Sequence, residues 1–259
     1  MTGTKERPIL RLSDVSKSFG GLVAVNQLSF EVNDGMILGL IGPNGAGKTT
    51  VFNLISGISP PTSGCVEFKG EDITQWRSYQ IAQAGLARTF QEIRLFKGLS
   101  VLENVKAAGY LRNYYSLAEA MLWMGRVRKA EKELEERAMA LLDRFNLSEY
   151  AHAQAEDLPY GMQKRLEIVK ALITDPKIVL LDEPAAGLNP DESLELMTLI
   201  KEIRTEYKLT ILVIEHDMAV IQGVSDKVIV INFGQKLVEG CWEEINCHEE
   251  VIRCYLGEG

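Results

Sequence analysis

The chain has 259 residues, of which 46% are hydrophobic and 25% charged, as in ordinary globular proteins. Its 36 acidic and 28 basic residues give a formal net charge of −8, which argues against a broad nucleic-acid-binding surface. No apolar run approaches the roughly 20 residues that span a bilayer, and residues 1–8 lack the apolar core of a signal peptide, so we expect a soluble cytoplasmic protein.

The first ninety residues predict short strands around one helix. Strands are predicted at residues 9–19, 28–32, 36–41, 65–68 and 85–90 from alternating or continuous apolar residues. Asn33-Asp34-Gly35 is a hairpin signal. Residues 50–57 have apolar side chains at helical spacing and end on Gly57, where we expect a helix to stop.

The character of the chain changes from Leu99 to about Leu147. Charges are dense from Arg126 to Arg144, and apolar residues recur every three to four positions. This pattern predicts an amphipathic helical subdomain inserted into an α/β core. Trp123 and Met124 could contact a partner, although packing within the subdomain is the simpler interpretation.

The second half of the chain returns to alternating strands and helices. Strands are predicted at residues 177–181, 210–214 and 227–231, and a helix at residues 190–207. Continuous apolar runs such as 178–181 are typical of parallel strands that are covered on both faces. The tail from Trp242 predicts two short helices. The fold class is therefore α/β.

The clearest motif is a glycine-rich loop between the strand at 36–41 and the following helix. It fits the pattern G-x-x-x-x-G-K-[ST], with residues Gly42, Pro43, Asn44, Gly45, Ala46, Gly47, Lys48 and Thr49. Glycines let successive backbone N–H groups face an anion, and the helix adds the positive end of its dipole. Lys48 is then expected to reach the β- and γ-phosphates, and the Thr49 hydroxyl to bind Mg²⁺.

Polar residues follow three of the predicted strands. Asp182 and Glu183 end the run at 178–181, where Asp182 suits Mg²⁺ binding and Glu183 could polarise the water that attacks a γ-phosphate. His216 follows the strand at 210–214 and could bond the γ-phosphate and that water. Gln91 follows residues 85–90, where its amide could contact Mg²⁺ and the water. Alone, each residue could equally be an ordinary strand end; together with the glycine-rich loop they predict nucleotide hydrolysis.

With these residues in place, the chain resembles the nucleotide-binding subunits of ATP-binding cassette (ABC) transporters over nearly its whole length. Residues 42–49 match the Walker A loop, Gln91 the Q-loop, 178–182 the Walker B strand, Glu183 the catalytic glutamate and His216 the switch histidine. Segments 88–96, 185–190, 214–218 and 251–258 are similar to branched-chain amino acid importers, and the tail favours the larger of their two ATPase subunits.

The resemblance implies a P-loop NTPase core with an antiparallel β subdomain and an inserted α-helical subdomain. Its parts are expected at 9–91 and 170–240 (α/β core with the β subdomain), 92–169 (helical subdomain with the signature segment) and 241–259 (C-terminal helical tail), within one domain spanning 1–259. It implies ATP and Mg²⁺ as ligands, with Mg²⁺ at Thr49, Gln91 and Asp182. Nucleotide contacts are implied for Phe19, which would stack on adenine, for Val25, and for Gly42, Pro43, Asn44, Gly45, Ala46, Gly47, Lys48, Thr49 and Thr50. Asn189 occupies the D-loop where aspartate is commoner.

One motif departs from the family pattern. The signature segment, usually Leu-Ser-Gly-Gly-Gln, is replaced by Leu158, Pro159, Tyr160, Gly161 and Met162. In the family this segment touches ATP that is held by the other subunit of a head-to-tail dimer. Pro159 has neither a hydroxyl nor a backbone N–H, and a lost hydrogen bond to a charged group is worth roughly 1.5–3 kcal/mol. We therefore expect weakened rather than abolished function in the site that uses this segment.

The resemblance implies a second ATPase subunit, with a heterodimer favoured over a homodimer. It also implies two membrane permeases, indirect contact with a periplasmic or extracellular solute-binding protein, no nucleic acid, and a peripheral position on the cytoplasmic face of the membrane. The substrate could instead be urea, an amide or another small solute, and a non-transport ABC ATPase is the alternative outside transport. A GTPase is disfavoured because the chain lacks an Asn-Lys-x-Asp segment.

Overall fold

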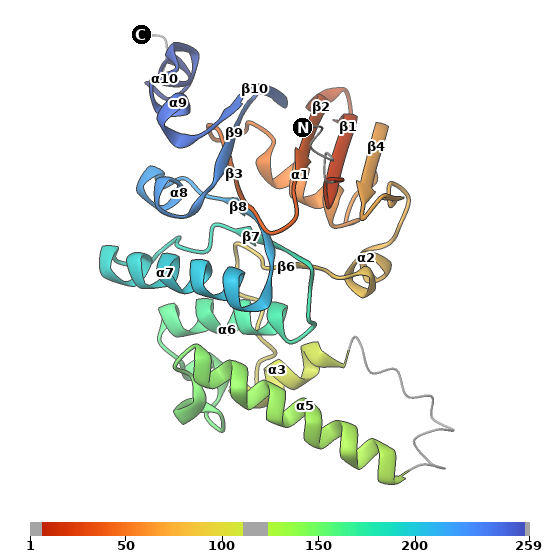
Figure 1. Cartoon of the computed structure of the whole chain (residues 1–259), viewed down its shortest axis with the longest axis vertical. Helices are drawn as coiled ribbons and strands as arrows, with labels where there is room; N and C mark the ends of the chain where they lie inside the picture. The colour runs from red at the N-terminus through yellow and green to blue at the C-terminus, as the bar shows by residue number, and fades with distance from the viewer. Residues whose placement is uncertain (1–6, 111–123, 257–259) are drawn as a thin grey trace, which may run out of the picture.

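The structure is a computed structural model that describes residues 7–110 and 124–256. Its larger sheet has six strands in the order β10-β9-β3-β8-β7-β6 (Figure 1). These strands are β3 (Ile37–Ile41), β6 (Leu86–Arg88), β7 (Ile178–Asp182), β8 (Thr210–Ile214), β9 (Lys227–Asn232) and β10 (Gln235–Gly240). Neighbouring strands from β9 to β6 are parallel, and only β10 pairs antiparallel. Every residue of β3, β7 and β8 is buried, which explains their continuous apolar runs.

The second sheet is antiparallel and has four strands in the order β2-β1-β4-β5. They are β1 (Leu10–Phe19), β2 (Leu22–Val32), β4 (Ser63–Phe68) and β5 (Glu71–Asp72). The hairpin predicted at Asn33-Asp34-Gly35 is wrong, because β2 and β3 belong to different sheets. β3 is buried along its whole length and has parallel partners on both sides, so the turn leads the chain from one sheet to the other.

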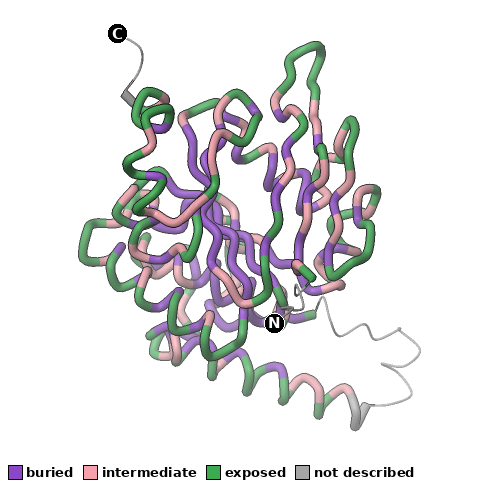
Figure 2. Tube along the Cα trace, turned by 45° about the horizontal axis from the view of Figure 1, so that its top comes forward, coloured by how far each residue is buried: buried purple, intermediate pink, exposed green. Residues whose placement is uncertain are grey.

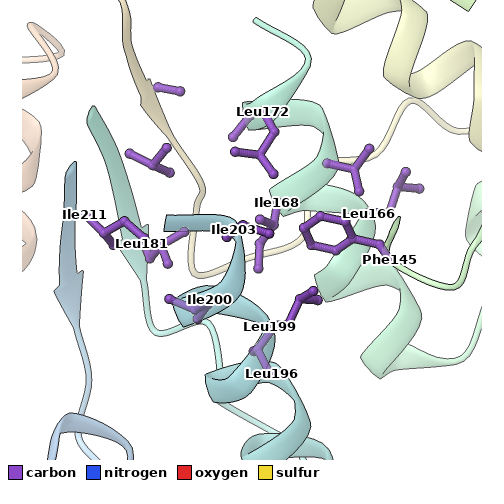
Figure 3. Close-up of a cluster of buried hydrophobic side chains, with 14 of the residues drawn as sticks. Phe145, Leu166, Ile168, Leu172, Leu181, Leu196, Leu199, Ile200, Ile203 and Ile211 are labelled. Atoms are coloured by element: carbon purple, nitrogen blue, oxygen red, sulfur yellow. The ribbon is translucent and has the colours of Figure 1, made fainter. Parts of the chain in front are cut away.

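Helices cover both faces of the six-stranded sheet. On one face, α1 (Lys48–Ile55) lies between the two sheets and buries Val51, Phe52 and Ile55 (Figure 1). The other face is covered by α6 (Tyr160–Leu172), α7 (Pro190–Tyr207) and α8 (Met218–Val224). Figure 3 shows strand residues Leu181 and Ile211 beside the helix residues Ile168, Leu172, Ile200 and Ile203. Alternate residues of each strand thus supply two separate cores.

The predicted helical subdomain is present at one end of the molecule (Figure 1). Its helices α3 (Val101–Gly109) and α5 (Met124–Arg144) pack on each other and on α6. The apolar positions that predicted an amphipathic helix face inward, and Leu134, Ala138 and Leu142 are buried. Trp123 lies outside the described residues. The α/β core, the antiparallel subdomain and the helical subdomain are all confirmed as fold elements.

The predicted elements do not include every element of the structure. A short helix, α2 (Ser78–Ala84), precedes β6. The tail forms two short helices as expected, α9 (Trp242–Asn246) and α10 (Glu249–Leu256), after the unpredicted edge strand β10. Figure 2 shows that burial is concentrated in the strands of the sheets and in the helix faces that cover them. Among the described residues, no helix is both long enough and apolar enough to cross a membrane.

Candidate active site

The glycine-rich loop joins β3 to α1 as the motif predicts. Gly47 precedes the first helical residue with φ +102°, and a Cβ atom there would lie 2.5 Å from the carbonyl oxygen of Ala24. Lys48 is buried, and its Nζ donates to the carbonyl oxygens of Gly42 (2.6 Å) and Pro43 (3.1 Å). Burial lowers the pKa of Lys48, while the charges of Glu183 and Asp182 oppose that shift. The loop thus holds an ammonium group over a helix N-terminus, an arrangement that suits a phosphate.

Three of the predicted site residues form one hydrogen-bonded chain. Gln91 Nε2 donates to Glu183 Oε2 at 2.8 Å, and His216 Nε2 lies 2.7 Å from Glu183 Oε1. They meet because Asp182 and Ile214 pair at the ends of parallel strands β7 and β8, and β6 lies on the other side of β7. The Glu183 carboxylate is therefore held between an amide and an imidazole.

The backbone of Glu183 adopts a conformation that is uncommon for residues other than glycine. Its φ is +49°, in the left-handed region. The Glu183 N–H donates to the carbonyl of Ile214 (2.9 Å), and its carbonyl accepts from the N–H of Ala186 (3.2 Å) and from Lys164 Nζ (3.2 Å). Such conformations persist where the surroundings over-determine them, which is frequent at functional sites.

A cavity of about 340 Å³ brings the loop and this chain of side chains together. Its lining comprises Ala24, Asn44, Gly45, Ala46, Gly47, Lys48, Thr49, Thr50, Gln91, Glu183 and His216. Val25, for which a nucleotide contact was expected, is fully buried beside the loop, and Ala24 lines the cavity in its place. Phe19 ends β1 with its side chain half exposed, outside this cavity. An exposed ring is compatible with base stacking.

Asp182 makes an ion pair that no sequence pattern predicted. Its Oδ2 accepts from Arg88 at 2.8 Å, and both side chains are almost fully buried. Arg88 also donates to Asn53 Oδ1 on α1 (2.7 Å) and to Oγ of Ser56, the C-cap of that helix (3.1 Å). The guanidinium lies over the rings of Phe52 and Phe90 as well. Arg88 therefore connects Asp182 to the helix that follows the glycine-rich loop.

Glu215 is a buried carboxyl group beside the catalytic candidates. It accepts hydrogen bonds from the N–H groups of Ala185 (2.7 Å) and His216 (3.2 Å). Burial, assisted by the negative charge of Glu183, raises the pKa of Glu215 to about 7, although these two hydrogen bonds and Lys164 oppose the shift. Glu215 supports the backbone on both sides of the site.

Glu215→Gln is expected to stabilise the protein at alkaline pH. The pKa of Glu215 is about 7 in the folded protein and 4.5 ordinarily, so ionisation of this carboxyl group opposes folding. This free-energy cost is absent below pH 4.5, grows between pH 4.5 and pH 7, and is complete above pH 7. The full difference is about 3 kcal/mol, of which we expect the glutamine, which keeps one acceptor, to recover about 1–3 kcal/mol at pH 8. Urea unfolding at pH 5 and pH 8 measures this; an equal effect at both pH values contradicts it.

The signature segment lies away from this chain's own cavity. Pro159 is the N-cap of α6, where it provides no side-chain hydrogen bond, and Tyr160 packs on Gly187 of the D-loop segment. Leu158 is buried, whereas Pro159 and Tyr160 are exposed and Gly161 and Met162 half-buried. None of the cavity's described lining residues comes from 158–162. Asn189 caps α7, accepting from the N–H of Glu192 at 2.9 Å, and this cap accounts structurally for an asparagine at that position.

Comparison with known proteins decides the family. The model of the family described as ABC transporter matches residues 25–186, more than half of the chain. The chain belongs to the ABC transporter family. It is 45% identical to the high-affinity branched-chain amino acid transport ATP-binding protein LivG of Salmonella typhimurium, over 97% of this chain and 99% of the relative. It is 43% identical, with the same coverage, to the corresponding protein BraF of Pseudomonas aeruginosa.

A solved structure supports the same assignment. The ADP conformation of MJ1267, an ATP-binding cassette of an ABC transporter, matches with a TM-score of 0.84 and 31% identity, covering 97% of this chain and 99% of that one. This member of the ABC transporter family is accordingly a nucleotide-binding ATPase subunit.

The residues expected to hold Mg²⁺ offer a suitable donor set. Thr49 supplies a hydroxyl, Asp182 a carboxylate and Gln91 an amide, which are the hard oxygen ligands that Mg²⁺ prefers. Thr49 and Gln91 line the cavity. Because Gln91 directs its Nε2 to Glu183, its amide oxygen is the atom that would bind the cation.

Proposed function

We propose that this chain hydrolyses ATP to power the import of branched-chain or related amino acids, as one of two ATPase subunits beneath two membrane permeases. The observation that carries the hydrolytic role is the Gln91–Glu183–His216 chain facing the phosphate loop in one cavity. The amino acid class rests on the names of the LivG and BraF relatives.

Each site residue has a defined task in this proposal. The backbone N–H groups of the loop and Lys48 bind the β- and γ-phosphates. Glu183 accepts the proton of the attacking water, while Gln91 and His216 fix the carboxylate's orientation. Mg²⁺, held by Thr49, Gln91 and Asp182, would neutralise phosphate charge. Phe19 would stack on the adenine.

The proposed contact with the permeases is a groove between the core and the helical subdomain. It has a volume of about 670 Å³ and is bordered by α2, β6, the segment after Gln91, α3 and α6. Its lining includes apolar side chains, among them Ile58, Ile81, Phe90, Phe96, Ala107 and Ala108. An apolar groove that begins next to Gln91 is suited to transmit movement between a permease segment and the site.

The two composite ATP sites of the proposed heterodimer are unequal. One uses this chain's Lys48, Glu183 and His216 with the signature segment of the sister subunit. The other uses Leu158 to Met162 of this chain, where Pro159 has no hydroxyl to offer the sister's nucleotide. We infer that the second site is the weaker one.

Pro159→Ser is expected to preserve or raise hydrolysis by the assembled complex, by up to about tenfold, because serine restores a hydroxyl to the segment. A serine at this N-cap is also expected to stabilise α6 by about 1 kcal/mol. ATP turnover and urea unfolding measure the two effects. Pro60→Ser, in an exposed loop, is the control for losing a proline; a tenfold loss of turnover in Pro159→Ser alone contradicts the inference.

Co-purification with its membrane partners tests the proposed function directly. The tagged chain should capture a second ATPase subunit and two permeases, and vesicles containing the complex should accumulate leucine, isoleucine or valine in preference to urea. Accumulation of urea or an amide instead would replace the substrate class and leave the ATPase role intact. Capture of ribosomes or DNA without permeases would overturn the transport role.

A further inference from the structure

Lys164 is a buried ammonium group on α6 for which the hydrolytic mechanism has no task. It lies one turn into the helix whose first residues are the signature segment, and only 4% of its surface is exposed. A lysine is rarely buried to this extent without polar partners. The polar partners of its ammonium group therefore indicate what Lys164 does.

The ammonium reaches the main chain of two site residues. Lys164 Nζ donates to the carbonyl oxygen of Gln91 at 3.0 Å and to that of Glu183 at 3.2 Å. Through these bonds, one side chain of α6 holds the backbone at the start of the Q-loop and at the catalytic carboxylate. Because the backbone of Glu183 has a φ of +49°, the bond from Lys164 to its carbonyl supports a strained conformation.

Burial and the surrounding carboxylates act on this ammonium group in opposite directions. Burial lowers the pKa of Lys164, and the negative charges of Glu215, Glu183, Glu167 and Asp182 oppose that shift. The ring of Tyr160, itself part of the signature segment, lies 5.8 Å from Lys164 Nζ. The ammonium that bonds to the site backbone thus also lies near the ring of a signature-segment residue.

We propose that Lys164 is a positioning residue that ties α6 to the carbonyls of Gln91 and Glu183, so that engagement of the signature segment by the partner's nucleotide sets the alignment of the carboxylate in this chain's own site. This inference rests on the proposed function, because the partner's nucleotide and the role of Glu183 belong to it. It gives the two ATP sites a physical connection through a single side chain.

The test uses the assembled complex with Lys164→Met. We expect kcat for ATP to fall about 10- to 100-fold, as small misplacements of catalytic groups do, with nucleotide Kd unchanged. Lys164→Arg, which keeps cationic donors, should recover part of the loss. Amide hydrogen exchange at residues 183–188 is the second readout, since the Ala186 N–H donates to the Glu183 carbonyl. It should quicken several-fold in Lys164→Met, and ATP should protect these amides less than in the natural protein.

Lys170→Met is the matched control. Lys170 lies on the same helix and also donates to a main-chain carbonyl, that of Arg94 at 2.5 Å, but it does not contact Gln91 or Glu183. Exchange at 183–188 should stay unchanged in this variant. Natural exchange and natural kcat in Lys164→Met overturn the positioning role. Absence of ATP turnover in the natural complex would instead count against the proposed function. The exchange measurement would still test whether Lys164 positions the backbone of Glu183.

Discussion

Glu183→Gln in this chain should remove most ATP hydrolysis of the assembled complex, about 10²- to 10⁴-fold, while ATP binding persists. The glutamine has nearly the same shape and keeps an acceptor for Gln91 or His216, so the cavity is preserved. It has no carboxylate to accept the water's proton. The loop residues that we propose to bind phosphate are untouched, and nucleotide Kd should change less than threefold.

The matching change in the proposed sister subunit should cost much less, because we propose that the site it disables uses the Pro159 signature. Glu202→Gln, whose half-exposed carboxylate pairs with Arg144 at the surface, is the control and should keep natural turnover. Single-turnover hydrolysis of each complex measures both changes. Equal losses from the two catalytic glutamates would contradict the asymmetry of the sites.

Arg88→Met is expected to lower the free energy of unfolding by about 3–5 kcal/mol, the range for breaking a buried ion pair from one side. It leaves the buried carboxylate of Asp182 without its cation and Asn53 without a donor. The double variant Arg88→Met with Asp182→Asn should lose less than the sum of the single losses, because it removes the uncompensated charge. Urea unfolding in the absence of nucleotide measures this coupling.

Arg94→Met separates the ion pair from the aromatic contact. Arg94 stacks on Phe90 at 3.9 Å, as Arg88 does at 5.1 Å, but Arg94 is exposed and does not pair with Asp182. We expect this control to cost less than about 1 kcal/mol. A similar loss in both arginine variants would mean that packing on Phe90, rather than the charge of Asp182, accounts for the effect.

The parallel strands of the core and the meeting of their polar ends follow from local sequence signals. Continuous apolar runs at 178–181 and 210–214 predict buried parallel strands, and carboxyl ends of such strands share one edge. The sequence therefore predicts Glu183 and His216 at one sheet edge, where they lie 2.7 Å apart. The motif at 42–49 predicts a phosphate-binding loop because a predicted strand precedes it and a predicted helix follows it.

The remaining features depend on contacts between distant parts of the chain. Arg88 and Lys164 have no distinctive local pattern; their roles appear only when β6, β7 and α6 pack together. The failed hairpin at Asn33-Asp34-Gly35 shows that turn chemistry predicts a change of direction but not the sheet that receives the next strand. The cavity is lined by Ala24, one position before Val25, which is fully buried.

The most direct test of the proposed function is ATP-driven uptake by vesicles that contain the complete complex, including the solute-binding protein. With ATP on the side of the ATPase subunits, the vesicles should concentrate a branched-chain amino acid and release phosphate in step with uptake. Both signals should disappear with Glu183→Gln in this chain and persist with Glu202→Gln. Uptake that continues at the natural rate in the Glu183→Gln complex would contradict the proposed role of this chain.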